Sequence, residues 1–300
     1  MTSSITTDAV VYIRGSIMKI KLLPAIIAAA GFLTVPFALA ATYQSEISAS
    51  YADIDSDAGA DDIYAAAVEG KYYISPVDTS GHPLAEAAFL EKASNIYVTA
   101  AVQQWKDDGF HADVYERSVG IDFYVPNSLF YLGAGVREDK YQTKYSADTT
   151  NGASAITFGR SWDSEWFVKA GITPIDGLLI WSEFVEDSDI SEKWNINGKY
   201  VVALTGEQAL NIEASYENSD EYFPAEAWSG AVDYYIDRHL SVGGGFTHST
   251  FENEGLNRGE DATDYFIRAR NYFTDNIGVE LGYVDGEHED SLTLGASIRF

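Results

Sequence analysis

Charged residues of both signs recur at every second position in many stretches of this chain. Glu69 and Lys71 show this spacing, as do Arg268 and Arg270. Side chains at positions i and i+2 point to the same face of a β-strand, so the spacing gathers them on one side of a sheet. Such groups can pair with one another, or line a water-filled passage and select the ions that cross it. Parity assigns the following candidates to this inner, pore-lining face: Glu69, Lys71, Glu116, Asp122, Arg137, Lys169, Lys199, Glu213, Asp233, Arg268, Arg270, Glu280 and Arg299.

Catalytic chemistry finds little support in the sequence. The chain has 5 histidines, mostly in segments that read as loops or turns. His248 and Ser249 are neighbours, so on a strand they point to opposite faces and cannot form a nucleophile–base pair. His111 and Asp113 do share a face, but no matching nucleophile accompanies them. We therefore expect no enzymatic activity and no cofactor.

One acidic segment has some likeness to a calcium loop. Residues 53–59 read DIDSDAG, with aspartates at alternate positions. The glycine comes one place later than in an EF-hand, and Tyr64 stands where the EF-hand has its bidentate glutamate. We interpret the segment as a solvated acidic loop and predict no metal site.

Strands are the elements that must position the charged face. The last ten residues alternate strictly, with Ser, Thr, Gly and Arg on one face and these residues on the other: Leu292, Leu294, Ala296, Ile298 and Phe300. A period of two with an apolar and a polar face is typical of a strand between lipid and water. Soluble sandwiches also alternate. Here the pattern recurs along nearly the whole chain, and its polar face is rich in glycine, which favours a membrane barrel.

Two kinds of connection separate the strands. Long, acidic segments include 54–61, 138–152, 186–192 and 252–261, whereas tight Pro-, Gly- or Asn-containing turns include 126–128, 174–177 and 205–207. This asymmetry is typical of outer-membrane barrels, which have short periplasmic turns and longer extracellular loops. The sequence predicts an all-β fold, a single antiparallel transmembrane β-barrel of about 14 strands, with 12 or 16 as alternatives. We expect one continuous strand over 153–173 rather than a hairpin, and a short strand or a periplasmic helix within 77–94.

The amino-terminal segment has the features of a secretory signal peptide. A basic stretch at Lys19 precedes the apolar run 22–33, and an A-x-A site ends at Ala40. We expect cleavage after Ala40, which leaves residues 41–300 as the barrel. Residues 1–17 precede an ordinary signal start, so we expect Met18 to be the true initiator.

Composition excludes several classes of partner. The formal net charge is −27, with 46 acidic and 19 basic residues, and there is no cysteine. A chain this acidic is not attracted to nucleic acid, nor by its overall charge to anionic lipid headgroups. The absence of cysteine removes any need for disulfides during export.

The signal peptide and three further segments resemble the general porins of marine gammaproteobacteria. The three segments are the opening strand 43–51, the segment 83–90 and the carboxy-terminal strand that ends on Phe300. The resemblance implies a passive channel in the Gram-negative outer membrane. It implies contact with outer-membrane lipid and lipopolysaccharide, and small hydrophilic solutes as cargo. It also implies that Phe300 is an assembly signal for the barrel-assembly machinery, and it leaves a homo-oligomer open.

The charge pattern adds an expectation of selectivity. Acidic loops at the mouth concentrate cations over a Debye length, ~8–10 Å at moderate salt. We expect passive diffusion of small hydrophilic solutes with weak cation preference, unless inner bases reverse the sign at the narrowest point. The alternative is a non-conducting structural or adhesive barrel whose inner charges pair and fill it.

Overall fold

The computed structural model describes residues 42–56, 62–107, 109–147, 154–159, 161–186, 192–219, 225–253 and 258–300. The predicted signal peptide and its cleavage site, and residues 57–59 of the acidic loop, lie outside these ranges. The described strands are β1 (Thr42–Ser56), β2 (Asp62–Asp78), β3 (Asn95–Asp107), β4 (Phe110–Tyr124), β5 (Phe130–Ala147), β6 (Ser154–Gly159), β7 (Asp163–Ile172), β8 (Leu178–Glu186), β9 (Glu192–Ala203), β10 (Ala209–Ser219), β11 (Ala225–Tyr235), β12 (Leu240–Asn253), β13 (Arg258–Thr274), β14 (Ile277–Asp285) and β15 (Glu289–Arg299).

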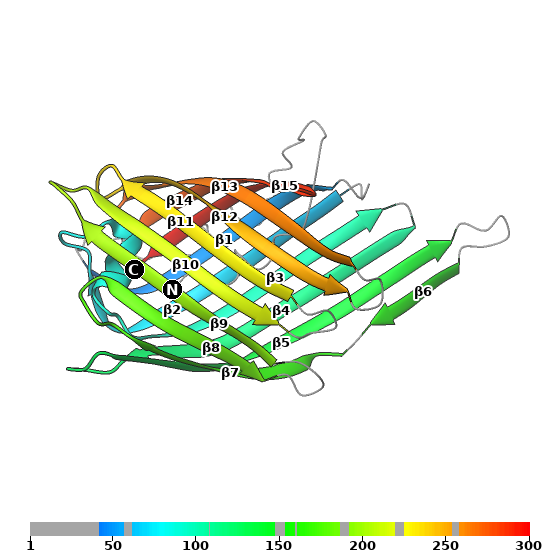
Figure 1. Cartoon of the computed structure of the whole chain (residues 1–300), viewed down its shortest axis with the longest axis horizontal. Helices are drawn as coiled ribbons and strands as arrows, with labels where there is room; N and C mark the ends of the chain where they lie inside the picture. The colour runs from blue at the N-terminus through cyan, green and yellow to red at the C-terminus, as the bar shows by residue number, and fades with distance from the viewer. Residues whose placement is uncertain are drawn as a thin grey trace.

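These strands form one antiparallel sheet that closes on itself (Figure 1). Each strand pairs with its sequence neighbours, and β1 pairs with β15 from Glu46↔Arg299 to Ser56↔Glu289. β6 pairs with β5 alone, so the closed ring has 14 strands. The prediction of a single antiparallel β-barrel of this strand number is confirmed. Closure leaves no unpaired sheet edge around the ring, which is what a sheet inside a bilayer requires.

The stretch 153–173 is neither one unbroken strand nor a hairpin. β6 and β7 lie end to end along the same edge of β5. Asp139 pairs with Asp163, whereas Gln142 pairs with Gly159, so three steps along β5 match four steps on the opposing segments. One extra residue of this kind disrupts the ladder as a β-bulge does, and it shifts the alternation of faces by one. The prediction of one continuous strand is therefore corrected.

Strands also extend into segments that the sequence analysis assigns to loops. β5 continues through Ala147 and β13 already begins at Arg258. Both extensions stay in register with their neighbours, Phe110↔Tyr145 on one side and Asn253↔Arg258 on the other. We call this end of the barrel, where β1 ends and β2 begins, the loop end, and the opposite end the turn end.

The connections at the turn end are short, with one exception. Asp237 closes the β11–β12 turn, because the backbone N–H groups of His239 and Leu240 donate hydrogen bonds to its Oδ1 at 2.7 and 2.9 Å. These backbone hydrogen bonds, the one from His239 first, lower the pKa of the Asp237 carboxyl. The exception is the segment 79–94, which joins β2 to β3.

The segment 79–94 folds into the turn end of the barrel. It contains the 3-10 helix η1 (Leu84–Glu86) and the short helix α3 (Ala87–Leu90), so of the two alternatives expected here the structure has a helix. The Leu84 N–H donates to the Arg238 carbonyl at 2.8 Å, and its carbonyl accepts from Arg299 at 2.7 Å. Leu84 and Ala87 are fully buried. The segment thus contacts β15 and the turn between β11 and β12, with the side chains of Leu84 and Ala87 buried.

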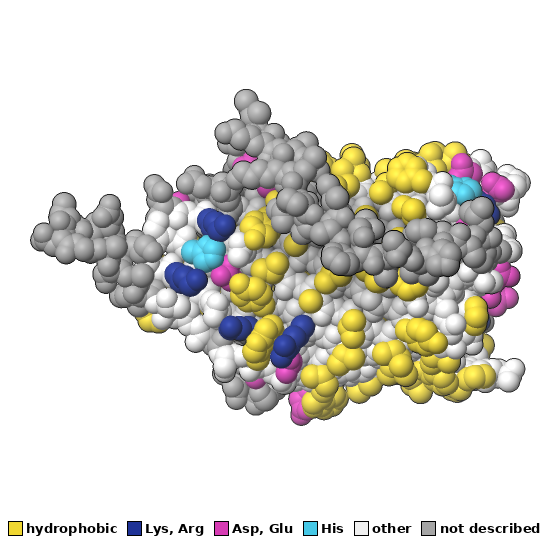
Figure 2. Space-filling view, turned by 180° about the vertical axis from the view of Figure 1, so that it is seen from behind, with side chains coloured by type: hydrophobic (Ala, Val, Ile, Leu, Met, Phe, Trp, Pro, Cys, Tyr) yellow, Lys and Arg dark blue, Asp and Glu magenta, His cyan; other side chains and the backbone are white. Residues whose placement is uncertain are grey.

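The outer face carries the opposite half of each alternating strand. Large apolar side chains stay exposed there, including Val98, Val119, Leu132 and Ile267. Figure 2 shows hydrophobic side chains spread over the described part of one such face. No helix within the described ranges is long and apolar enough to cross a membrane. The exposed apolar surface therefore lies on the strands, where a bilayer would cover it.

Candidate functional site: the charged interior of the barrel

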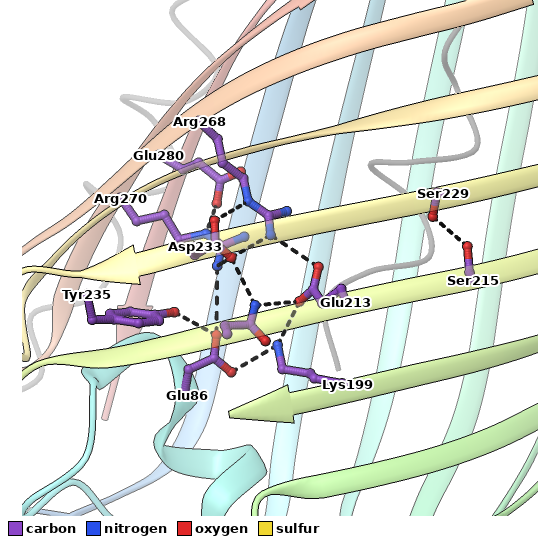
Figure 3. A network of polar contacts seen from close by, with 11 residues as sticks. Glu86, Lys199, Glu213, Ser215, Ser229, Asp233, Tyr235, Arg268, Arg270 and Glu280 are labelled. Carbon is purple, nitrogen blue, oxygen red and sulfur yellow. Dashed lines mark hydrogen bonds and ion pairs between the residues drawn. The ribbon is translucent and has the colours of Figure 1, made fainter. Parts of the chain in front are cut away.

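The interior of the barrel holds three groups of charged side chains, and the largest spans β9 to β14. We call it the β9–β14 cluster, and Figure 3 shows most of it. Its members come from five strands and from η1, and they are Glu86, Lys199, Asn211, Glu213, Asp233, Tyr235, Arg268, Arg270 and Glu280. Alternate residues of a strand point to the same side, so the strand residues of this cluster all face the interior, as the sequence predicts.

Asp233 and Arg268 form the centre of this cluster. Arg268 donates to the two carboxylate oxygens of Asp233 from Nε at 2.7 Å and from Nη2 at 2.5 Å. This two-point geometry is the strongest form of arginine–carboxylate pairing. The two residues are not on adjacent strands, since Gly243 of β12 is the register partner of both. A Cβ at Gly243 would collide with the Asp233 carboxylate and the Val232 carbonyl, so the glycine lets Arg268 reach Asp233 across β12.

Glu213 and Lys199 continue the cluster towards the helical segment. Arg268 Nη2 lies 3.1 Å from Glu213, and Lys199 Nζ lies 2.9 Å from the other oxygen of Glu213. Lys199 Nζ also lies 2.9 Å from Glu86 Oε2. The Tyr235 hydroxyl donates to Glu86 Oε1 at 2.6 Å. Glu86 is 1% exposed, so its charge is held inside the barrel by a base and a hydroxyl.

Arg270 joins the cluster more loosely. Its Nε donates to Glu280 at 2.5 Å, and its Nη1 lies 3.9 Å from both Glu86 and Asp233. Glu280 keeps about a third of its side chain exposed. The structure thus pairs two of the candidates that parity assigns to the inner face.

A second group, which we call the β3–β8 cluster, repeats the same construction. Lys169 Nζ lies 3.4 Å from Asp122, 3.6 Å from Glu183 and 3.2 Å from the Tyr97 hydroxyl. Gly133 of β5 is the register partner of both Asp122 and Lys169. A Cβ there would stand 3.0 Å from each of these side chains. A row of acid, glycine and base on three adjacent strands thus occurs twice in the interior.

The remaining members of this second cluster extend it along the barrel. The Tyr131 hydroxyl donates to Asp122 at 2.6 Å. Arg137 lies 3.6 Å from Glu116 and 3.7 Å from Glu183. Three acidic groups on two strands, β4 and β8, therefore converge on two bases.

The third group lies where the first and last strands meet. Arg299 donates from Nε to Glu46 at 2.7 Å, and its guanidinium stands over the rings of Tyr43 and Tyr272 at 4.6 and 4.5 Å. Cation–π contacts of this kind stabilise a buried guanidinium in addition to its ion pair. Lys71 Nζ lies 2.8 Å from Glu69 on the same strand.

Every interior residue that parity selects has an opposite charge within ion-pair distance in the structure. Asp122 pairs with Lys169, Glu213 with Lys199, and Asp233 with Arg268, while the other pairs are Glu69–Lys71, Glu116–Arg137, Arg270–Glu280 and Arg299–Glu46. The thirteen candidates fall into the three groups rather than one.

Some residues of the three clusters are not among the thirteen candidates that parity selects. Glu86 lies in a connection, where alternation assigns no face, so only the fold reveals it. Tyr131 and Tyr235 are nearly fully buried and bind Asp122 and Glu86. Both occupy inward positions of their strands, so parity is the sequence signal that could have found them.

Phe300 occupies the seam rather than the interior. Its N–H donates to the Ser45 carbonyl at 3.0 Å, and its carbonyl accepts from the N–H groups of Gln44 and Ser45 at 3.0 and 2.8 Å. The side chain is 37% exposed. The last residue therefore contributes backbone hydrogen bonds to closure of the ring.

The histidine pair that the sequence analysis notes is present but lies elsewhere. His111 Nε2 lies 3.0 Å from Asp113. Both sit at the parity opposite to Asp122, on the outer face near the loop end. The pair therefore takes no part in the three interior clusters.

Comparisons with solved structures agree with this architecture. Omp33 of Acinetobacter baumannii has a TM-score of 0.61 at 21% identity, covering 87% of this chain and 99% of that one. A FadL homologue of Pseudomonas aeruginosa has a TM-score of 0.56 at 10% identity, covering 86% and 90% of the two chains. The CymD monoaromatic hydrocarbon channel has a TM-score of 0.56 at 8% identity, covering 86% and 89%. At these identities the likeness is one of fold, and no curated protein sequence matches.

A match to a family model decides which family the chain belongs to. The model described as "Putative general bacterial porin" matches residues 19–300, nearly the whole chain. The family description indicates a transport role. The chain therefore belongs to this general bacterial porin family and is an integral β-barrel of the outer membrane.

Proposed function

We propose that this porin allows passive diffusion of small hydrophilic solutes and ions, with a weak preference for cations. The observation that carries the proposal is the charged interior of a closed ring of 14 strands. Ion pairs such as Lys169–Asp122 and Lys199–Glu213 point inwards from many strands, whereas the lipid-facing positions are apolar. A ring of this size leaves an inner space that strand side chains alone fill poorly.

The preference for cations follows from the balance of charge. Within the three clusters, carboxylates outnumber bases, because Glu46, Glu86 and Glu183 add to the candidates chosen by parity. The loop segments are also acidic in the sequence. A negative mouth raises the local concentration of cations, and salt screens the effect. Arg268 and Arg270 are the groups that oppose it.

The competing function is a non-conducting structural barrel. The observation in its favour is the segment 79–94, whose Leu84 and Ala87 are fully buried at the turn end. Its Glu86 is held by Lys199 and Tyr235 from the opposite side of the ring. This segment narrows the passage, so the conductance of the purified protein decides between the two functions.

The test is a planar-bilayer recording of the refolded chain 41–300. We expect stepwise conductance and, in a low-salt KCl gradient, a zero-current potential of the sign for K⁺ preference that shrinks as salt rises. A preparation unfolded by heat serves as the control for leakage. Absence of steps from folded protein supports the structural barrel, and a potential of the opposite sign shows that the inner bases dominate.

We also propose the processing and assembly that the sequence indicates. Export would require removal of residues 1–40, with Ala41 as the first mature residue, and the barrel-assembly machinery would insert the chain next to lipid and lipopolysaccharide. Amino-terminal sequencing of the membrane-inserted protein checks the cleavage site. Cross-linking in membranes checks whether barrels associate.

A further inference from the structure

The inner face of β1 to β4 becomes apolar towards the loop end. These four strands are consecutive in the ring (Figure 1). In the half near the turn end, their inward positions carry charged side chains such as Glu46 and Lys71. The inward positions nearer the loop end are mostly small or apolar, and we call the following residues the inner apolar patch: Ala52, Ile54, Ile63, Ala65, Ala67, Ala101, Trp105, Ala112 and Val114. The inner wall of these strands is therefore divided into a charged and an apolar part.

Contacts between members of the patch confirm that they share one face. Ile54 and Ile63 are register partners and are only 6% and 3% exposed. Ala65 and Trp105 pack against them. Ala65, Trp105 and Val114 are half-buried, so part of each side chain stays accessible inside the barrel. An apolar area on the wall of a polar passage gains free energy when an apolar group of a solute covers it.

An ion pair borders this patch. Glu116 is the next inward residue of β4 after Val114, about 7 Å further along the strand. It is the register partner of Ala101, so it lies at the edge of the patch. Arg137 of β5 lies with its Nε 3.6 Å from Glu116 Oε1. An acid and a base thus stand together directly beside the apolar part of the wall.

Glu116 and Arg137 form the most accessible of the interior ion pairs described above. Their side chains are 36% and 24% exposed. The next pair in this respect, Arg270–Glu280, has values of 19% and 35% and is closed by a hydrogen bond of 2.5 Å. A separation of 3.6 Å is too long for a hydrogen bond between Arg137 and Glu116. A solute can therefore approach both groups without breaking a hydrogen bond between them.

We propose that Glu116, Arg137 and the inner apolar patch bind zwitterionic α-amino acids that have an apolar side chain. The ammonium group of the solute donates to Glu116, and its carboxylate accepts from the guanidinium of Arg137. Its side chain lies over Ala101 and Val114 and points towards Trp105. This inference rests on the proposed diffusion function and names a class of solute for it.

The chemistry of the three contacts favours this class of solute over its relatives. A guanidinium presents a fork of N–H donors that matches a carboxylate, and both polar contacts are charge-assisted hydrogen bonds. The apolar side chain adds the free energy of burial against the patch. A zwitterion has no net charge, so the acidic loop segments do not repel it as they would an anion.

The test measures binding to the refolded barrel in detergent micelles by saturation-transfer NMR, which detects weak ligands. The probe is L-phenylalanine. Three relatives each lack one group: glycine lacks the apolar side chain, L-phenylalaninamide the carboxylate, and 3-phenylpropionate the ammonium. We expect each relative to bind the wild-type protein at least about tenfold more weakly than phenylalanine.

Substitutions then assign each contact to a residue. Glu116→Gln should weaken phenylalanine by at least about tenfold and leave 3-phenylpropionate, which has no ammonium, no weaker. Arg137→Gln should weaken phenylalanine to a similar extent and leave phenylalaninamide no weaker. Val114→Asn should weaken phenylalanine and leave glycine unchanged. This crossed pattern separates the loss of a contact from a general loss of structure.

Matched controls make the same changes of charge away from the patch. Glu91→Gln changes a carboxylate that is 40% exposed in the segment 79–94, and Arg117→Gln changes an arginine that is 53% exposed on the outer face. Both should leave the binding of phenylalanine unchanged. Heat-dependent gel mobility verifies that each variant is folded.

Several results would overturn the proposal. They are failure of the folded wild type to bind phenylalanine, glycine bound as tightly as phenylalanine, and equal binding by the wild type and the Glu116 and Arg137 variants. The measurement needs no ion flow, so it is distinct from the test of conduction. Binding without conductance steps would refute passive diffusion and keep the site, whereas steps without binding would refute the site alone.

Discussion

Asp233 accepts hydrogen bonds from Arg268 and Asn211, and it is 1% exposed. Removing one partner of a buried ion pair costs about 3–5 kcal/mol when the other charge is left without compensation. Arg268 keeps Glu213 at 3.1 Å as a second partner, so we expect Asp233→Asn to lower the free energy of unfolding by less than that range, by about 2–3 kcal/mol. Urea unfolding of the refolded barrel in lipid vesicles measures it.

Glu280 provides the matched comparison for this residue. It pairs with Arg270 at 2.5 Å, but about a third of its side chain is exposed to solvent. Exposed pairs contribute about 1 kcal/mol or less, so Glu280→Gln should change stability far less than Asp233→Asn. Equal losses in the two variants would show that burial does not govern these pairs.

At the scale of the strand, the interior glycines decide which charges meet. Gly243 is the register partner of Asp233 on one side and of Arg268 on the other. An alanine there must displace the Asp233 carboxylate, and overpacking of this kind costs about 1–3 kcal/mol. We expect Gly243→Ala to lower unfolding stability accordingly.

The control for this substitution is a glycine on the strand at the other side of Arg268. Gly282 of β14 is also a register partner of Arg268, but a Cβ there meets its nearest atoms at 3.7 and 3.8 Å, which is ordinary contact. Gly282→Ala should therefore be neutral, or stabilise the strand by about 0.5–1 kcal/mol because alanine loses less backbone entropy. If both alanine variants behave alike, steric contact with Asp233 is not the reason for glycine at position 243.

The segment 79–94 is the element that sets the width of the turn end. Glu86 joins it to Lys199 and to Tyr235. Glu86→Ala removes both contacts, so we expect the segment to move more freely and single-channel conductance in planar bilayers to rise.

Glu91 of the same segment is the control for this experiment. Its side chain is 40% exposed and contacts His82 of the same segment at 2.8 Å. Glu91→Ala should leave the conductance unchanged. A conductance unaltered by either substitution would mean that ions pass without displacing the segment.

At the scale of the whole molecule, Phe300 connects closure with assembly. Its backbone completes hydrogen bonds to Gln44 and Ser45, so deleting it would disturb the seam as well as any recognition signal. Phe300→Ala keeps the backbone and removes only the ring. We expect less barrel in the outer membrane of cells, with the unit conductance of the inserted fraction unchanged. Quantification of heat-modifiable protein in isolated membranes checks the amount, and normal insertion would argue against a role for the ring.

The ion selectivity of the whole barrel depends on its summed charge. We expect the K⁺ preference to fall as KCl is raised from about 0.01 to 1 M, because the Debye length shrinks from about 30 to 3 Å. Zero-current potentials at fixed concentration ratio measure this. A preference that does not change with salt would place its origin in buried pairs such as Lys169–Asp122, which are screened far less.

The sequence by itself determined the strands and the face to which each charged residue belongs. Side-chain direction in a strand depends on local backbone geometry alone, so parity placed residues as distant as Glu69 and Arg299 on the inner side. The same local rule identified the apolar face and hence the membrane barrel. It was less reliable at 153–173, where one extra residue breaks the alternation.

Only the tertiary structure decided which of these charges meet. Arg268 reaches Asp233 because β11, β12 and β13 are adjacent in a fixed register with Gly243 between them. Glu86 enters the site because a connection folds across the ring, and alternation says nothing of a connection. These contacts depend on pairing and closure between residues far apart in the chain, which a local pattern does not encode.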